Sequence, residues 1–133
     1  MNTFELKIVT PDGLRYDGMA EELVVRTTSG DLGIMAGHVN CVAPLGMGQA
    51  LAVIDGKKRY GACIGGMVSV MGNTVSVVAT SFEWADQIDL DRAIASEERA
   101  KGVLADKKVS DEALRLAEAR LKRALIRQSV ANK

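Results

Sequence analysis

The sequence divides at residues 81–93, SFEWADQIDLDRA. Before this stretch the chain is punctuated by turn residues, because 12 of the 13 glycines and both prolines precede residue 85. After it the chain is rich in alanine, with 10 alanines among residues 85–133. Short glycine-punctuated segments are typical of β-structure, and alanine-rich periodic segments are typical of helices. The sequence therefore predicts a β domain over residues 1–84 and a helical domain over residues 85–133.

The β domain begins with an alternating strand pattern, in which Phe4, Leu6 and Ile8 place apolar side chains on one face. Two hairpin signals follow, Asp55-Gly56 and Gly72-Asn73, each between β-branched runs. Turns at this spacing predict about eight to ten short antiparallel strands, arranged as a sandwich or a flattened barrel.

The helical domain reads as two helices joined by a short connection at residues 105–109. Asp89 and Ser110 are predicted N-caps, because their side-chain oxygens accept orphan backbone N–H groups. A short connection predicts an antiparallel hairpin. Its expected seam consists of Leu114, Ala117, Leu121 and Leu125 on the second helix, facing Leu90, Ala93, Ala100, Val103 and Leu104. Since alanine buries little apolar area, the hairpin is expected to be marginal alone, and we hypothesise that it switches between folded and extended forms.

Composition excludes several functions. The 17 basic and 17 acidic residues balance, and only five residues are aromatic, which argues against nucleic-acid binding. The sequence has no apolar run near the ~20 residues that cross a bilayer and no secretory signal pattern. We therefore expect a cytoplasm-like compartment, with Cys41 and Cys63 reduced and buried. The single histidine, His38, has no nucleophile to activate, so no catalytic residue and no metal site are predicted.

The charges of the two helices are more informative. Residues 115–133 contain six basic residues and one acidic residue. Arg120, Arg123 and Arg127 share one helix face by spacing, as Arg92 and Arg99 do on the first helix. In an antiparallel hairpin these guanidinium groups approach one another, and their forked donors match phosphate oxygens. The residues alone leave three interpretations open: a solvated basic face, an anion site, or a face for an acidic protein partner.

Four short segments carry a resemblance to one family. They are VTPDG at residues 9–13, GDLGIMAGH at residues 30–38, GGM at residues 65–67 and IDLDRA at residues 88–93. In order and spacing they resemble the epsilon subunit of the bacterial F-type ATP synthase over nearly the whole chain.

The resemblance implies a β-sandwich of about ten strands followed by the helical hairpin. It also implies a non-catalytic rotor subunit, bound to the gamma subunit and the c-ring, that helps couple proton flow to ATP synthesis. Extended, the helices would contact the catalytic alpha/beta head and inhibit ATP hydrolysis. Such a subunit is peripheral at the cytoplasmic face of the bacterial cell membrane, without inserting into the bilayer.

The resemblance also assigns residues. It places Asp31 and His38 in the segment that faces the c-ring. In some bacterial members the folded hairpin binds a regulatory ATP, with no obligatory cofactor. The matching positions are Glu83, Ile88, Asp89, Arg92, Ala93, Arg99, Arg123 and Arg127. Trp84 is expected to crowd or stack on a bound base. The alternative is a free-standing nucleotide-sensing module with no rotor role and no affinity for gamma.

Overall fold

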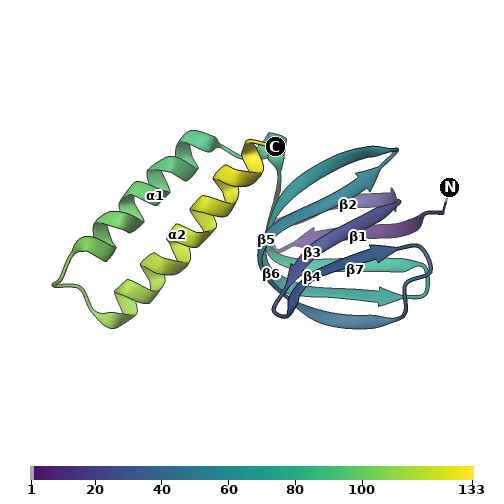
Figure 1. The fold of residues 1–133 in the computed structure, drawn as a ribbon, viewed down its shortest axis with the longest axis horizontal. Coiled ribbons are helices and arrows are strands. Elements are labelled where there is room, and N and C mark those ends of the chain that lie inside the picture. Colours follow the sequence, from purple (N-terminus) through teal and green to yellow (C-terminus); the bar gives the residue numbers. More distant parts are fainter. Residues whose placement is uncertain (1) are drawn as a thin grey trace. The chain divides into compact units, whose positions relative to one another are not determined.

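The structure, a computed structural model, describes residues 2–133 and falls into two compact units, Met1–Trp84 and Ala85–Lys133. The first unit contains the strands and the second contains the helices (Figure 1). Each unit is described by itself below.

Residues 2–133 form seven strands, fewer than expected, although the β-sandwich class followed by a helical hairpin is confirmed. The strands are β1 (Phe4–Thr10), β2 (Gly13–Ala20), β3 (Glu22–Thr27), β4 (Gly30–Met35), β5 (Cys41–Ile54), β6 (Lys57–Met71) and β7 (Thr74–Trp84). They form one hydrogen-bonded sheet in the order β2-β1-β7-β6-β5-β3-β4.

The strand count falls because long strands bend rather than end. Residues 59–64, which follow the Asp55-Gly56 turn, and residues 68–71, which precede the Gly72-Asn73 turn, both belong to the 15-residue β6. Between them Gly66 has a φ of 111°, and a Cβ there would lie 2.0 Å from the Val78 carbonyl oxygen. Only glycine fits this close approach, so the strand changes direction without leaving the sheet.

One strand pair departs from the expected antiparallel arrangement. β1 pairs in parallel with β7, with Glu5 opposite Thr74 and Val9 opposite Val78. Parallel neighbours need a long crossover connection, and β2 to β6 provide it. The first and last strands of this unit are therefore joined side by side.

The core of the first unit follows the predicted alternation. Phe4, Leu6 and Ile8 are buried, and the core extends to β7 through Val77 and Phe82. Both predicted hairpins are confirmed, with positive φ at Asp55, Gly56 and Gly72. Cys63 is buried as expected, but Cys41 is only half-buried, which corrects the prediction for that residue.

The second unit contains a short 3-10 turn, η1 (Ala85–Gln87), and two helices, α1 (Leu90–Ala105) and α2 (Asp111–Ala131). Both predicted caps are confirmed. The Asp89 carboxylate accepts from the Arg92 backbone N–H at 3.0 Å, and the Ser110 hydroxyl accepts from the Ala113 N–H at 3.1 Å. The helices lie side by side and run antiparallel (Figure 1).

The seam between the helices is lined by alanine. Ala93 and Ala100 of α1 and Ala117 and Ala124 of α2 are buried. Leu125 is 47% exposed, so its predicted place in the seam is wrong. Each four-residue step turns about 40° beyond a full circle, so two successive steps from Ala117 rotate Leu125 out of the seam. Ala124 takes its place.

Candidate functional site

The residues predicted to hold ATP divide between the two units. Glu83 is half-buried on β7 in the first unit, and the other seven lie in the second unit. Asp89 caps α1, so one of its carboxylate oxygens is committed to the Arg92 backbone N–H. Ala93 is fully buried in the seam, and Ile88 is half-buried just before the helix.

The buried alanines and the short connection set the register of the two helices. Ala93 and Ala100 of α1 and Ala117 and Ala124 of α2 are buried at the same seven-residue spacing, and five residues join the helices. Antiparallel packing therefore pairs Ala100 with Ala117 and Ala93 with Ala124, and other levels follow from the helical rise of about 1.5 Å per residue. On this scale Arg92 lies between the levels of Arg123 and Arg127, and Arg99 lies about 7.5 Å from the level of Arg123, toward the connection. Gln128 Nε2 reaches Glu97 Oε1 at 2.7 Å because both side chains lean toward the N-termini of their helices.

The arginines also share one flank of the seam. At about 100° per residue, the positions turn to the same side of the buried alanines on both helices. We call this surface the arginine face, made of Arg92, Arg99, Arg120, Arg123 and Arg127. Arg123 and Arg127 are half-buried and the other three are exposed.

Most guanidinium groups of the arginine face have no recorded ion-pair partner among the described residues. Among residues 2–133, the structure records no ion pair to the guanidinium groups of Arg92, Arg99, Arg120 or Arg123. A group of guanidinium donors at similar levels is suited to an anion with several oxygens, such as a chain of phosphates.

A polar cluster beside this face was not predicted. The Glu97 carboxylate is held between Lys101 Nζ at 2.5 Å and Gln128 Nε2 at 2.7 Å, and its side chain is only 14% exposed. The hydrogen bonds from Lys101 and Gln128 lower the pKa of Glu97, against a weaker desolvation effect. The hydrogen bond between Lys101 and Glu97 also raises the pKa of Lys101. The four-residue spacing of Glu97 and Lys101 predicts their ion pair from the sequence alone. The contact with Gln128 could not be predicted in this way, because it depends on how the two helices pack.

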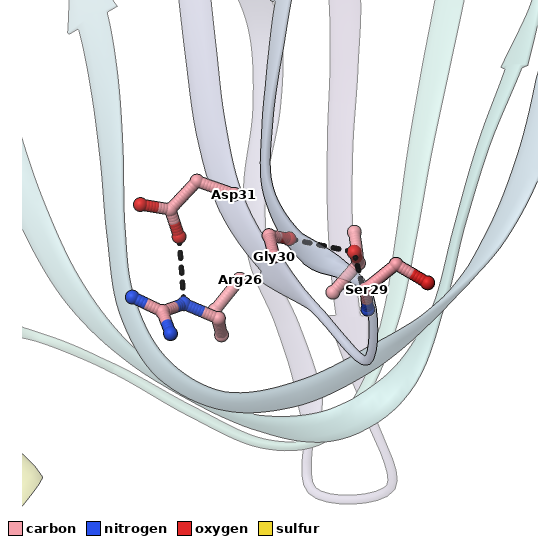
Figure 2. Close-up of polar contacts among 5 residues, drawn as sticks. Arg26, Ser29, Gly30 and Asp31 are labelled. Carbon is pink, nitrogen blue, oxygen red and sulfur yellow. Dashed lines mark hydrogen bonds and ion pairs between the residues drawn. The ribbon is translucent and has the colours of Figure 1, made fainter.

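Asp31, predicted to face the c-ring, lies at the turn between β3 and β4 (Figure 2). Its carboxylate forms an ion pair with Arg26 Nε at 2.7 Å, and both side chains are more than half exposed. Arg26 lies over a glycine of β5, since a Cβ at Gly48 would lie 2.7 Å from the Arg26 Cβ. Beside the pair, the Thr27 hydroxyl donates to the Gly30 carbonyl at 2.6 Å and tightens the turn.

His38 lies beyond the other end of β4. Its backbone N–H donates to the Met35 carbonyl at 3.1 Å, and its Nδ1 lies 2.7 Å from the Val39 carbonyl oxygen. The strand from Asp31 to Met35 alone spans about 13 Å. The structure therefore places Asp31 and His38 at opposite ends of one strand and does not bring them together.

An apolar row that the sequence reasoning missed crosses the outward surface of the sheet. Strand pairing puts Pro44 of β5 opposite Met67 of β6, Met67 opposite Val78 of β7, Val78 opposite Val9 of β1, and Val9 opposite Leu14 of β2. Met67, Val78 and Leu14 are 43%, 57% and 53% exposed. We call these five residues the apolar row. It is invisible in any one strand, because it appears only when the pairing register is known.

Trp84 does not have the predicted ring surface for a nucleotide base. Its ring is covered by Arg59, whose guanidinium carbon lies 4.0 Å from the ring centre, and by edge contacts with Phe82 and Tyr16. Its indole N–H donates to the Arg15 carbonyl at 3.0 Å. Trp84 is thus part of the packing of the first unit.

Within residues 2–133, no three His, Cys, Asp or Glu side chains are grouped so that they could hold a metal ion. No helix in the same part of the chain is both long enough and apolar enough to span a membrane.

Comparison with known proteins gives consistent matches. The family described as "ATP synthase, Delta/Epsilon chain, beta-sandwich domain" matches residues 3–85. The ATP synthase epsilon chain of Bacillus velezensis is 42% identical over 98% of both chains, and that of Bacillus pumilus is 43% identical over 100% of both. A chain of the Euglena gracilis mitochondrial ATP synthase structure (OSCP/F1/c-ring) aligns at a TM-score of 0.83 and 19% identity, covering 97% of this chain and 81% of that one. A chain of the Tetrahymena thermophila mitochondrial central stalk/c-ring structure aligns at 0.61 and 14% identity, covering 96% and 95%. At these identities the two structures show likeness of fold.

Proposed function

The chain belongs to the family of ATP synthase delta/epsilon chains, and from that membership we propose that it is a non-catalytic central-stalk subunit of a proton-translocating F-type ATP synthase. In this role it rotates with the gamma subunit and helps couple proton flow to ATP synthesis. The observation that carries the proposal is the match to chains named ATP synthase epsilon chain at 42% and 43% identity over 98% and 100% of both partners. The subunit would be peripheral at the cytoplasmic face of the bacterial membrane.

The first unit supplies the surfaces for this assembly. The apolar row is the surface proposed to bind gamma, because exposed apolar side chains aligned across five strands are typical of a protein interface. The c-ring contact is proposed to run along β4. Since β4 is the last strand of the sheet, Asp31 and the His38 loop both lie on one sheet edge despite their separation.

Calorimetric titration of the full chain with the gamma subunit of the same organism tests the docking. We expect a stable complex, and we expect Met67→Asp to weaken it at least tenfold, because the substitution buries an unpaired carboxylate in the interface. Gln49→Asp is the matched control, since Gln49 is an exposed β5 residue outside the apolar row and the charge change is the same. Absence of binding by the parent chain would favour the free-standing nucleotide-sensing module instead.

The second unit is proposed to regulate ATP hydrolysis. Folded, the hairpin would hold ATP with its phosphates on Arg92, Arg123 and Arg127, whose levels differ by no more than about 6 Å, and on Arg99, about 7.5 Å beyond the level of Arg123. Extended, the basic α2 would contact acidic surfaces of the catalytic alpha/beta head. ATP at a hundred times its dissociation constant would stabilise the folded form by about 2.7 kcal/mol, which is enough to bias a hairpin with an alanine seam.

ATP titration of the full chain, followed by calorimetry, tests this site. We expect saturable binding that Arg123→Ala and Arg127→Ala each weaken at least tenfold. Lys122→Ala is the control, because Lys122 is an exposed cation on the opposite flank of α2. If all three variants lost ATP affinity equally, ATP would be responding to the overall positive charge and not to a defined site. If the parent chain did not bind ATP, the arginine face would instead be assigned to contact with an acidic protein surface.

A further inference from the structure

One hydroxyl group adjoins the arginine face. The two helices and their connection contain three serines and no threonine or tyrosine: Ser96, Ser110 and Ser129. Ser110 caps α2, and Ser129 is exposed on the other flank of the seam. Ser96 is half-buried on α1, about 60° from the buried Ala93 and on the same side as the arginines. Ser96 is therefore the serine that a ligand on the arginine face would meet.

Two guanidinium groups converge on Ser96 from opposite helices. In the register of the buried alanines, Ser96 lies about 3 Å from the level of Arg123 and about 4.5 Å from the level of Arg99. Side chains on a helix lean toward its N-terminus, so Arg99 leans back toward the level of Ser96. Because α2 runs in the opposite direction, Arg123 leans toward the same level from the other side. Ser96 thus lies between two cations, and among residues 2–133 neither cation has a recorded ion pair.

The surroundings of Ser96 leave room for an anion. A serine inside a helix often returns its hydroxyl to a carbonyl one turn earlier, but within the described residues no hydrogen bond to the Ser96 side chain is recorded. The next residue, Glu97, turns about 100° away, and Lys101 and Gln128 hold its carboxylate. A hydroxyl donor between two guanidinium groups suits one phosphoryl group, whose oxygens can accept hydrogen bonds from all three.

The direction of the nucleotide determines which phosphate would lie at Ser96. The nucleoside would lie near Ile88 and Asp89, at the start of α1. The levels of Arg127 and Arg92 come next along the hairpin, and the level of Ser96 lies about 6 Å beyond that of Arg92. A phosphate chain that extends from the nucleoside past these two arginines would therefore bring its last phosphate, and not its first, to Ser96.

We propose that Ser96, Arg99 and Arg123 form a subsite for the terminal phosphate of ATP, in which the Ser96 hydroxyl donates a hydrogen bond to that phosphate. The inference rests on the proposed nucleotide site and assigns it a residue that distinguishes ATP from ADP. ADP has no third phosphate, so it would leave the Ser96 hydroxyl without this acceptor. The folded hairpin would thereby respond to the ratio of ATP to ADP and not to the total adenine nucleotide.

Calorimetric titrations of the full chain with ATP and with ADP, at one salt concentration and without added divalent cation, test the proposal. We expect the parent chain to bind ATP more tightly than ADP. Ser96→Ala should weaken ATP binding about five- to tenfold and change ADP binding less than about twofold, because only ATP loses a hydrogen bond. Alanine favours a helix more than serine does, so a destabilised helix would not explain this loss.

Two further variants isolate the hydroxyl group. Ser96→Thr keeps it and should keep the ATP affinity within about twofold of the parent chain. Ser129→Ala is the matched control, because it removes a hydroxyl from the other flank of the hairpin and should leave ATP binding unchanged.

The possible outcomes separate the subsite from the nucleotide site. Equal affinities of the parent chain for ATP and ADP, an unchanged ATP affinity in Ser96→Ala, or equal losses toward both nucleotides would overturn the subsite and leave the ATP site standing. A loss in Ser129→Ala as large as in Ser96→Ala would also overturn the subsite. Failure of the parent chain to bind either nucleotide would overturn both.

Discussion

At the scale of single residues, Gly66 shows how a backbone position constrains the sandwich. It combines a φ of 111° with a space that the Val78 carbonyl already fills. We expect Gly66→Ala to lower the free energy of unfolding of the first unit by about 2–4 kcal/mol, because both strain and a steric clash result. Urea denaturation measures this change. Gly102→Ala is the control, since Gly102 lies inside α1 with open space around it, and there alanine should stabilise by about 0.5–1 kcal/mol. Equal effects of the two substitutions would contradict the account.

The two cysteines should differ in reactivity. Burial raises the pKa of Cys63 to about 12, so very little thiolate exists at neutral pH, whereas Cys41 is half-buried. We expect alkylation by iodoacetamide at pH 8 to modify Cys41 first and Cys63 only when the sandwich unfolds. Mass spectrometry of a time course measures both rates. Comparable rates in the native protein would show that Cys63 is not buried as described.

At the scale of elements, features set by neighbouring residues were predicted correctly more often than features set by contacts between distant segments. The caps at Asp89 and Ser110 and the turns at Asp55-Gly56 and Gly72-Asn73 depend on neighbouring residues, and the structure confirms them. The number of strands depends on whether a glycine ends a strand or bends it, and Gly66 bends β6 by contact with β7. Leu125 was misplaced because the seam passes through Ala124 and Gln128, which a leucine-based stripe does not reveal.

The Glu97 cluster predicts how the hairpin responds to pH. Hydrogen bonds from Lys101 and Gln128 hold the pKa of Glu97 below its ordinary 4.5. Its contribution to hairpin stability is therefore fully present above pH 4.5 and is lost as the pH falls through the lowered pKa. We expect the helical melting temperature between pH 6 and pH 3 to fall less in Glu97→Gln than in the parent chain. Far-UV circular dichroism measures both slopes, and identical slopes would mean that the carboxylate does not stabilise the hairpin.

At the scale of the whole molecule, the sequence predicted the class of fold and the residue types of the candidate site, but not the arrangement of its surfaces. Motif positions such as Asp89 and Arg92 lie within a few residues of each other and can be assigned from the chain alone. The apolar row needs the register of five strands, and the levels of the arginines need the pairing of the buried alanines across the two helices. Such features come from pairing between distant segments, which periodicity does not encode.

The central proposal is that this chain would regulate an ATP synthase by opening and closing its hairpin. Ala100 and Ala117 are both buried in the seam and face each other in the register set by the buried alanines, so cysteines at these positions would lock the hairpin closed when oxidised. The most direct test measures ATP hydrolysis by reconstituted alpha, beta and gamma subunits with the Ala100→Cys/Ala117→Cys chain, in a Cys41→Ser/Cys63→Ala background. We expect the oxidised chain to leave hydrolysis uninhibited and reduction to restore inhibition, while the Ala100→Cys chain alone inhibits in both states. Equal hydrolysis rates with the oxidised and reduced double-cysteine chain would contradict the claim.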